Sequence, residues 1–225
     1  ASQIHWFVVE SDINDNTLEL FDQIANLNSK FRYISCGKLS DNMHSRTARI
    51  AYCRNKYLDE IRNNPIYQEI DYVVVVDLDG INDGLTADAV ISCWDNTGWD
   101  AVFANQDAPY YDVWALRHSV WCPADCWEQY HFFIKSGIKN EFALYAAVIS
   151  KMIIVPKDFK LIPVDSAFGG LGIYRKEAIT SIVAVYKGLT SSGLEICDHV
   201  PFNKSLSANG AKLHINPKLI NGGYN

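Results

Sequence analysis

A run of four valines constrains the fold of this chain more than any other feature. In "DYVVVVDLDG", residues 71–80, the valines lead directly to two aspartates, Asp77 and Asp79. A near-continuous β-branched run of this kind is typical of a strand covered on both faces in the centre of a mostly parallel sheet. We therefore expect an α/β protein in which this strand ends in a pair of acidic side chains.

Strand-like and helix-like segments alternate along the rest of the chain. Strand patterns occupy residues 4–11, 31–38, 100–106 and 110–117, and helical patterns occupy residues 16–30, 45–64, 85–96, 123–137, 139–152 and 198–210. The alternation predicts a three-layer α/β/α, Rossmann-like fold that forms one domain over residues 1–225. Ligands of such sheets bind beyond the carboxyl ends of the strands, which places Glu10, Ser11, Asp77 and Asp79 at one edge.

Charge and hydropathy narrow the class of protein. A formal charge of −6 argues against a nucleic-acid partner and against an anionic membrane surface. The longest apolar stretch, residues 142–155, contains Ser150 and Lys151 and is too short for a membrane-spanning helix. No signal-peptide pattern is visible, and the six scattered cysteines are more typical of reduced thiols than of a disulfide framework. We expect a cytoplasmic protein.

The acidic pair suits a metal ion. Carboxylates at positions i and i+2 of an extended segment can point the same way, and the bend that Gly80 permits lets both face one cation. Mn²⁺ and Mg²⁺ prefer such oxygen ligands and keep positions open for phosphate oxygens. The alternative is that Asp77 or Asp79 only makes a turn or caps a helix, because Asp-Gly is an ordinary turn dipeptide.

Three other stretches contain residues suited to the same chemistry. Arg54 in "RIAYCRN" can neutralise a diphosphate, or can belong to a solvated helix face. Gly169 and Gly170 in "DSAFGGLGIYR" let backbone approach a ligand, or make a plain turn. Asp198 and His199 in "EICDHVPFN" offer a base and a metal ligand, or a helix cap.

Taken in order, "CRN", "VVVVDLD", "SAFGGLGIYR" and "CDHVPFN" resemble the nucleotide-sugar-dependent glycosyltransferases of the GT-A fold, over roughly residues 4–217. The chain is similar to the glycosyltransferase domains of large algal DNA viruses and, more distantly, to fungal mannosyltransferase-like proteins. The resemblance implies transfer of a sugar from a UDP-sugar donor to a glycan or glycoprotein acceptor, with Mn²⁺ or Mg²⁺ as cofactor. For a viral protein it implies action in the host cytoplasm.

The resemblance also implies which residues hold the donor. Asp77, Leu78 and Asp79 resemble the D-x-D motif, whose two carboxylates hold the metal ion and, through it, the donor diphosphate. Glu10 and Ser11, after the first strand, occupy the place where the family meets the nucleoside.

The remaining implied contacts come from the other three motifs. Arg54 matches an Arg-Asn position near the donor, Gly169 and Gly170 match a loop on the sugar side, and His199 matches a late metal or phosphate contact. An inverting enzyme needs a carboxylate base, for which Asp198 is our candidate; in a retaining enzyme Asp198 would orient the donor instead.

The acceptor is expected to meet residues between the strands and the later helices. Asp112 and Arg117 are candidates for binding the acceptor or the donor sugar. Aromatic side chains there can act as flat platforms for a sugar, although we expect at least half of them to pack in the core: Tyr110, Tyr111, Trp114, Trp121 and Trp127.

Other functions remain open. "VVVVDLDG" also resembles the nucleophile strand of haloacid-dehalogenase-type phosphatases, with Asp77 as nucleophile, but Ile81 stands where that family has threonine and no Asp-Asp pair follows. A sugar-nucleotide-binding module without turnover is a further alternative. A structural zinc site is another, with four candidate ligands of suitable type but unsuitable spacing: His118, Cys122, Cys126 and His131.

Overall fold

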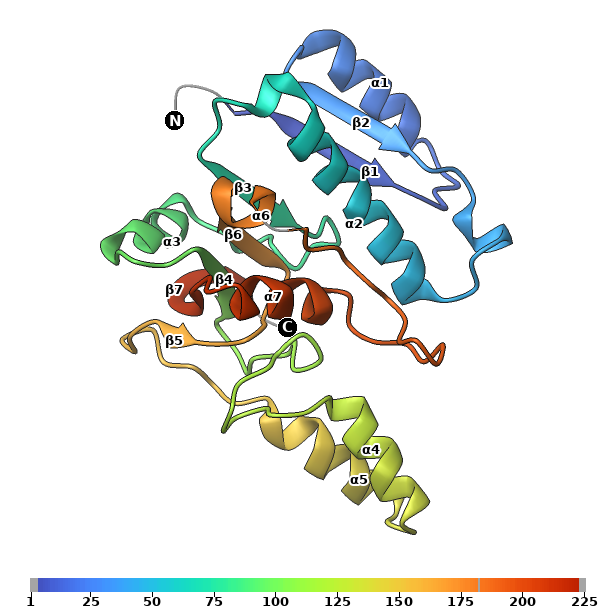
Figure 1. Cartoon of the computed structure of the whole chain (residues 1–225), viewed down its shortest axis with the longest axis vertical. Helices are drawn as coiled ribbons and strands as arrows, with labels where there is room; N and C mark the ends of the chain where they lie inside the picture. Colours follow the sequence, from blue (N-terminus) through green and yellow to red (C-terminus); the bar gives the residue numbers. More distant parts are fainter. Residues whose placement is uncertain (1–3, 182, 223–225) are drawn as a thin grey trace. The chain divides into compact units, whose positions relative to one another are not determined.

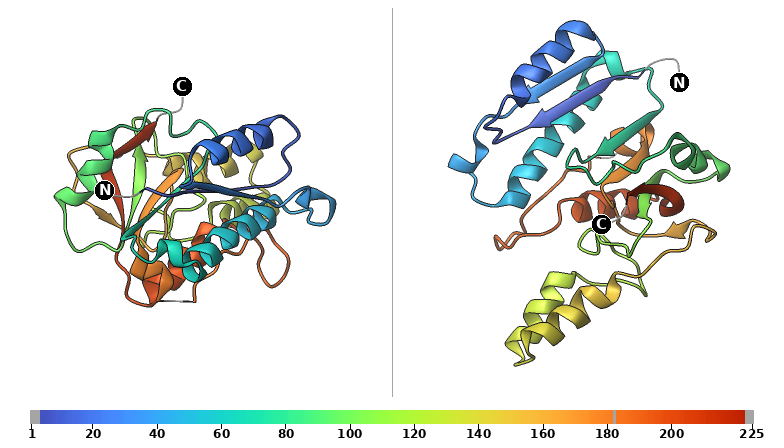
Figure 2. Two further views of the ribbon diagram at one scale, coloured as in Figure 1. Left: turned by 90° about the horizontal axis from the view of Figure 1, so that it is seen from above. Right: turned by 180° about the vertical axis from the view of Figure 1, so that it is seen from behind.

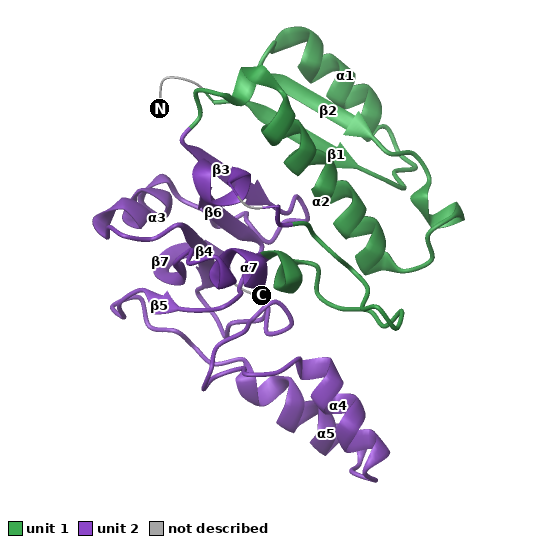
Figure 3. Cartoon of the chain, viewed as in Figure 1, with its two compact units in different colours: residues 1–70, 185–202 green, residues 71–184, 203–225 purple. Residues whose placement is uncertain are grey.

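The computed structural model describes residues 4–181 and 183–222. The chain forms two compact units, which Figure 3 distinguishes by colour. Unit 1 consists of residues 1–70 and 185–202, and unit 2 consists of residues 71–184 and 203–225. The single domain expected over residues 1–225 stays a prediction.

Unit 1 contains a parallel pair of strands between two helices. Strand β1 (Trp6–Glu10) pairs with β2 (Phe31–Ser35) in a register that sets Glu10 opposite Ser35. Helices α1 (Thr17–Leu27) and α2 (Arg46–Asn63) lie on opposite faces of this pair, as the view from above in Figure 2 shows. The predicted βα unit is confirmed, and unit 1 by itself has three layers.

The long helix α2 begins where the sequence predicts. The side chain of Ser45 accepts a hydrogen bond from the backbone N–H of Ala48 at 3.2 Å and so caps the first turn. The helix buries Thr47, Ala51 and Leu58, which lie on one side of it. Two short 3₁₀ helices, η1 (Leu39–Asp41) and η2 (Pro65–Tyr67), stand before and after it.

Unit 2 contains a mixed sheet of five strands in the order β3-β6-β4-β7-β5. These strands are β3 (Tyr72–Val76), β4 (Ala101–Gln106), β5 (Ile162–Pro163), β6 (Leu171–Arg175) and β7 (Leu213–Gly222). Strand β6 runs antiparallel to both β3 and β4, and β5 runs antiparallel to β7, whereas β4 and β7 are parallel. The α/β class is confirmed, and the mostly parallel central sheet is not.

Strand β3 is not covered on both faces, as its valine run had led us to expect. Val73 and Val75 are buried, but Val74 between them is 53% exposed, so burial alternates along the strand. A β-branched residue is favoured in a strand on either face. The run therefore indicates a strand but neither full burial nor the direction of its neighbours.

The helices of unit 2 follow the predicted segments in shorter form, except α6, which was not predicted. They are α3 (Ala87–Ile91), α4 (Cys126–Lys135), α5 (Asn140–Ala147) and α6 (Lys176–Thr180), labelled in Figure 1. Helix α7 (His199–Ala208) begins in unit 1 and ends in unit 2 (Figure 3). Two 3₁₀ helices extend the ends of α3 and α5: η3 (Ser92–Asp95) and η4 (Ile149–Lys151). Residues 110–117, expected to be a strand, form a turn and one isolated bridge between Arg117 and Ser166.

The core of unit 2 surrounds Trp99. This side chain is fully buried, and its indole N–H donates to the carbonyl of Cys93 at 2.8 Å. Around it pack Val102 and Ala104 of β4 with Leu171 of β6. None of the helices in the described part of the chain is long and apolar enough to cross a membrane.

Candidate functional site

The acidic loop after β3 is bound directly to the paired glycines. The backbone N–H of Asp77 donates to the carbonyl of Gly170 at 3.0 Å. The side-chain amide of Asn82 donates to the carbonyl of Asp77 at 2.8 Å and to that of Gly170 at 3.1 Å. Two motifs that lie far apart in the sequence are thus joined by two hydrogen bonds, and a third, from Asn82 to Asp77, lies within the acidic loop.

The glycine turn requires glycine at both positions. Gly169 and Gly170 have φ angles of 66° and 86°, a region that side chains rarely adopt. A Cβ atom on Gly170 would lie 2.6 Å from Cγ2 of Ile81, and one on Gly169 would lie 2.9 Å from the carbonyl oxygen of Ala104. This is a close approach between the turn and the acidic loop, not a plain surface turn.

Polar side chains hydrogen-bond to the backbone of the glycine turn. The Gln106 amide donates to the carbonyl of Gly169 at 3.2 Å, and the Asn221 amide donates to the same carbonyl at 2.7 Å and to Oδ1 of Asn82 at 2.8 Å. A carboxylate oxygen of Asp112 accepts from the N–H of Gly169 at 2.9 Å. We therefore name Asn82, Gln106, Asn221 and Asp112 the turn-support cluster.

Three members of the turn-support cluster were not predicted. Asn82, Gln106 and Asn221 are neutral amides without a motif around them, so nothing in a single sequence distinguishes them from loop or surface residues. The only feature that could have indicated them is their place along the strands. Gln106 ends β4 and Asn221 lies near the end of β7, and ligand-binding groups of α/β sheets lie at strand ends. Strand β7, which contains Pro217, was itself not predicted.

The loop presents its acidic residues to solvent. Asp77 is half-buried, Asp79 is exposed, and Leu78 between them is 72% exposed. Oδ1 of Asp79 accepts a hydrogen bond from the N–H of Ile81 at 3.4 Å, so Asp79 also makes the turn that the sequence offered as the alternative. The structure leaves the rest of the Asp79 carboxylate on the surface of unit 2.

Two carboxylates agree with a metal that is shared with a phosphate ligand. Residues 4–181 and 183–222 contain no group of three or more His, Cys, Asp or Glu side chains arranged to hold a metal ion. Mg²⁺ in phosphate-handling sites is bound through one or two carboxylates together with water and substrate phosphates. The two carboxylates of Asp77 and Asp79 are the number that such a site uses, and whether they bind a metal stays a prediction.

In unit 1 the other two motifs meet in a buried ion pair. Nε of Arg54, on α2, lies 2.7 Å from Oδ2 of Asp198, and both side chains are largely buried. The Arg54 guanidinium carbon lies 5.8 Å from the centre of the Tyr186 ring. Arg54 therefore does not belong to a solvated helix face, and "CRN" and "CDHVPFN" form one cluster.

Helix α2 binds the segment before Asp198 through Tyr186. The Asn55 amide donates to the Tyr186 carbonyl at 3.0 Å, and the Tyr186 N–H donates to Oδ1 of Asn55 at 2.9 Å. The hydroxyl of Tyr57 donates to that of Tyr186 at 2.6 Å. Burial raises the pKa of the Tyr57 phenol above its ordinary value, so this hydroxyl keeps its proton.

His199 is enclosed beside this ion pair. It is 2% exposed, and its ring meets the Tyr186 ring edge-on at 5.5 Å between centres. Burial, and secondarily the charge of Arg54, lower the pKa of His199 well below its ordinary value. The ring is therefore neutral near pH 7, which is the form that can bind a metal.

Glu10 and Ser11 differ in whether their side chains have hydrogen-bond partners. Glu10 is 9% exposed, and neither of its carboxylate oxygens has a hydrogen-bond partner among the described residues. Ser11 hydrogen-bonds to the side chain of Asp12, which has a positive φ of 66°. A buried acceptor without a donor is costly, so Glu10 is the residue of this pair that a ligand hydroxyl or N–H would satisfy.

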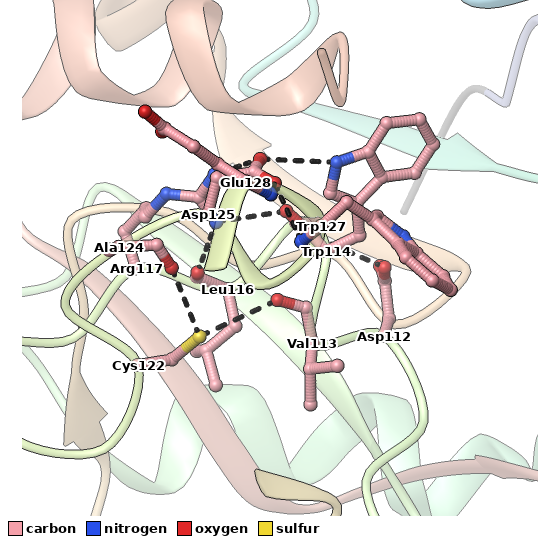
Figure 4. Close-up of polar contacts among 11 residues, drawn as sticks. Asp112, Val113, Trp114, Leu116, Arg117, Cys122, Ala124, Asp125, Trp127 and Glu128 are labelled. Carbon is pink, nitrogen blue, oxygen red and sulfur yellow. Dashed lines mark hydrogen bonds and ion pairs between the residues drawn. The ribbon is translucent and has the colours of Figure 1, made fainter. Parts of the chain in front are cut away.

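Arg117 has an internal role, which Figure 4 shows. Its guanidinium pairs with Oδ2 of Asp125 at 2.7 Å and donates to the carbonyls of Trp114 and Leu116 at 3.0 and 2.6 Å. The Trp114 indole donates to the same Asp125 oxygen at 3.1 Å, while Oδ1 of Asp125 caps α4. The guanidinium N–H groups of Arg117 are therefore hydrogen-bonded within unit 2. Of the two predicted sugar contacts, Asp112 is the one that lies at the glycine turn.

Of the five predicted aromatic platforms, only Tyr110 is buried, so the expectation that at least half of them pack in the core is not confirmed; the other four are half-buried or exposed: Tyr111, Trp114, Trp121 and Trp127. Tyr110 is fully buried and meets Trp121 edge-on, and the Trp121 indole donates to a backbone carbonyl. Trp127 is partly exposed on α4. The Tyr111 hydroxyl lies close to Gly170, so Tyr111 is the platform candidate beside the glycine turn.

The structure does not bring the four candidate zinc ligands together. In the described ranges 4–181 and 183–222, no three His, Cys, Asp or Glu side chains form a group that could hold a metal ion. Nδ1 of His118 accepts hydrogen bonds from two backbone N–H groups, and His131 lies exposed on α4.

The predicted site residues thus form two groups. Asp77, Leu78, Asp79, Gly169 and Gly170 belong to unit 2, and Glu10, Ser11, Arg54, Asp198 and His199 belong to unit 1. In each unit, motifs that are distant in the sequence are brought together. The sequence matches none of the protein-family models with which we compared it, and none of the curated proteins.

Proposed function

We propose that the protein is a metal-dependent glycosyltransferase that moves a sugar from a nucleotide diphosphate, a UDP-sugar, to a glycan acceptor. The observation that carries the proposal is the direct hydrogen bonding of the Asp77–Asp79 loop to the Gly169–Gly170 turn. These are the residues expected to hold the donor diphosphate and to meet the donor sugar. Their attachment to each other supports one binding surface that serves both halves of the sugar–phosphate bond.

The chemistry of that bond explains the need for a cation. Its cleavage develops positive charge on the sugar and negative charge on the departing nucleotide. Asp77 and Asp79 would hold Mn²⁺ or Mg²⁺, which supplies positive charge where the leaving group becomes more negative. The turn-support cluster would keep the two carboxylates in place, since preorganised groups lose no energy to rearrangement during the reaction.

For the residues of unit 1, the resemblance implies roles that stay predictions: Glu10 at the nucleoside, and Arg54 and His199 as phosphate or metal contacts. The ion pair with Arg54 favours an orienting role for Asp198, because a carboxylate in a buried pair with arginine is a weaker base. Cytoplasmic action and a viral setting belong to the same proposal.

The test is metal-dependent binding of UDP. We expect Mn²⁺ to strengthen UDP binding by the native protein, and Asp79→Ala to remove that strengthening while binding without metal stays the same. The matched control is Asp83→Ala, which removes another exposed carboxylate from the same loop. Equal loss in both variants, or no loss in Asp79→Ala, would refute the metal assignment.

A thermal-shift screen separates this function from phosphate transfer. Ligands that bind the native state raise the unfolding midpoint. A rise with UDP-sugars and Mn²⁺ supports sugar transfer, whereas a rise only with vanadate or beryllofluoride supports the phosphatase that uses Asp77 as nucleophile. Hydrolysis of the donor then distinguishes an enzyme from a binding module without turnover.

A further inference from the structure

Helices α4 and α5 form a helical hairpin at one end of unit 2 (Figure 3). The hydroxyl of Tyr130 on α4 donates to Oδ1 of Asn140 on α5 at 2.5 Å, which joins the two helices near their turn. Helix α4 packs mainly against α5, and α5 packs against α4 and η4. We name residues 126–154 the α4–α5 arm. Because its helices pack mainly on each other, much of its surface is left to solvent or to a partner.

The α4–α5 arm exposes an unusual number of large apolar side chains. Phe142, Tyr145 and Ile149 are 62%, 61% and 46% exposed, and their spacing of three and four residues places them on one face of α5 and its continuation η4. The residues that α5 buries, Ala143 and Ala147, share another face. Six further apolar side chains of the arm are exposed: Trp127, Phe132, Ile134, Ile138, Ile153 and Ile154. A concentration of this kind marks an interaction surface.

The turn between the two helices is fixed by backbone hydrogen bonds and is basic. Gly137 has a φ of 83°, and the N–H of Ile138 donates to the carbonyl of Phe133 at 3.1 Å, which closes the end of α4. Lys135 and Lys139 on either side of this turn are exposed, as is Ile138 between them. The sequence from 133 to 139 contains no acidic residue. The turn therefore presents apolar and positively charged side chains together.

The charge of the arm is opposite in sign to that of the rest of the chain. The arm contains three lysines and two glutamates, a net charge of +1, whereas the other residues together carry −7. The whole-chain charge that argued against an anionic membrane surface therefore lies outside the arm. A two-fold contact between copies, centred on the turn, would bring its lysines together, whereas an anionic lipid surface attracts them.

We propose that the α4–α5 arm docks on the surface of an anionic lipid bilayer. Phe142, Tyr145 and Ile149 enter the boundary between headgroups and acyl chains, and Lys135 and Lys139 extend to the lipid phosphates while their stems cover apolar surface. Helices α4 and α5 have 10 and 8 residues and are too short to cross a bilayer, so they lie in its surface. The proposal does not rest on sugar transfer.

The test is flotation of the purified protein with vesicles of phosphatidylcholine alone and of phosphatidylcholine mixed with phosphatidylserine. We expect the wild type to bind the mixed vesicles at least about tenfold more tightly, because each lysine near an anionic surface contributes about fivefold. Lys135→Gln with Lys139→Gln should remove most of this preference. The matched control is Lys30→Gln with Lys38→Gln, which removes two exposed lysines of unit 1 and should keep it.

A second pair of variants tests the apolar contact. Phe142→Ser with Tyr145→Ser should weaken binding to mixed vesicles by at least about tenfold, because two aromatic side chains no longer enter the lipid. Leu20→Ser with Leu27→Ser removes two exposed apolar side chains of α1 and should bind like the wild type. The replaced side chains are all exposed, and far-UV circular dichroism checks that each variant is folded.

Three results would overturn the proposal. They are wild-type protein that does not float with mixed vesicles, arm variants that bind as well as the wild type, and control variants that lose as much binding as the arm variants. If the arm instead joins two copies of the chain, sedimentation without vesicles will show a dimer that Phe142→Ser with Tyr145→Ser separates, and flotation will be absent. No nucleotide is present in the experiment, so its failure is distinct from failure of the proposed sugar transfer.

Discussion

Replacing Gly170 with alanine adds one methyl group at a position where φ is +86°. A residue with a Cβ atom in this left-handed region costs about 1–2 kcal/mol. The new atom would lie 2.6 Å from Cγ2 of Ile81, 3.2 Å from the Tyr111 hydroxyl and 3.3 Å from the Asn221 amide nitrogen. Ile81 is β-branched and its side chain cannot turn away freely, so the overpacking adds about 1–3 kcal/mol.

Gly98→Ala separates these two costs. Gly98 is also in unit 2 and has a φ of +82°, but no atom lies within 4 Å of an added Cβ. We expect Gly98→Ala to lower the free energy of unfolding by about 1–2 kcal/mol, from backbone strain alone. Gly170→Ala should lower it by about 2–5 kcal/mol, from strain and overpacking together.

The assay is urea unfolding of the wild type and each variant, followed by far-UV circular dichroism and by tryptophan fluorescence, to which the buried Trp99 contributes. Ile81→Ala in the Gly170→Ala background removes the nearest clashing atom, so the pair should be less destabilising than the sum of its single changes by about 1 kcal/mol. If Gly170→Ala were no worse than Gly98→Ala, or the two changes were simply additive, the close approach of the glycine turn to the acidic loop would be refuted.

Two further predictions concern unit 1. Arg54→Met should lower the free energy of unfolding by about 3–5 kcal/mol, because it leaves Asp198 buried without its cation. The control is Lys157→Met, which breaks an exposed pair with Asp107 and should lower the free energy of unfolding by less than about 1 kcal/mol. Equal losses of the two variants in urea titrations would contradict the buried pairing. Because the folded state lowers the pKa of His199, the unfolded chain binds more protons: stability is retained above the ordinary pKa of 6.5 and falls as pH drops below it, by about 1.4 kcal/mol per pH unit. The free energy of unfolding, measured by urea titration of wild type and of His199→Asn from pH 8 to pH 5, should differ between the two with this slope. If the two plots of free energy against pH were parallel, that would argue against a buried neutral ring.

Local patterns in the sequence were enough to locate most helices and several strands. Apolar residues at helical spacing in residues 16–30 and 45–64 correspond to α1 and α2, and Ser45 marks the start of α2 because a side-chain oxygen there can cap the first turn. Gly210, the last residue of the predicted helical segment 198–210, follows α7 with a φ of 90°. Such features depend on neighbouring residues alone, which is why they can be read without the fold.

The direction of the strands could not be read in the same way. The valines of β3 favour an extended backbone, but they carry no information about whether β6 runs with or against it. The expectation of a mostly parallel sheet followed from βαβ alternation, and it missed β6, which the chain inserts antiparallel between β3 and β4. Strand order and direction depend on long connections, and the entropic cost of closing such connections is similar for several topologies.

By itself, the sequence determined the chemistry available to this protein: carboxylates at Asp77 and Asp79 after a strand, and paired glycines at Gly169 and Gly170. The structure showed that these glycines cannot be replaced without strain. Tertiary structure decided which of these groups meet. It joined the acidic loop to Gly170 through Asn82, and it paired Arg54 with Asp198 in the other unit. Hydrogen bonds and ion pairs of this kind act over about 3 Å, and only folding brings residues so distant in the chain within that range.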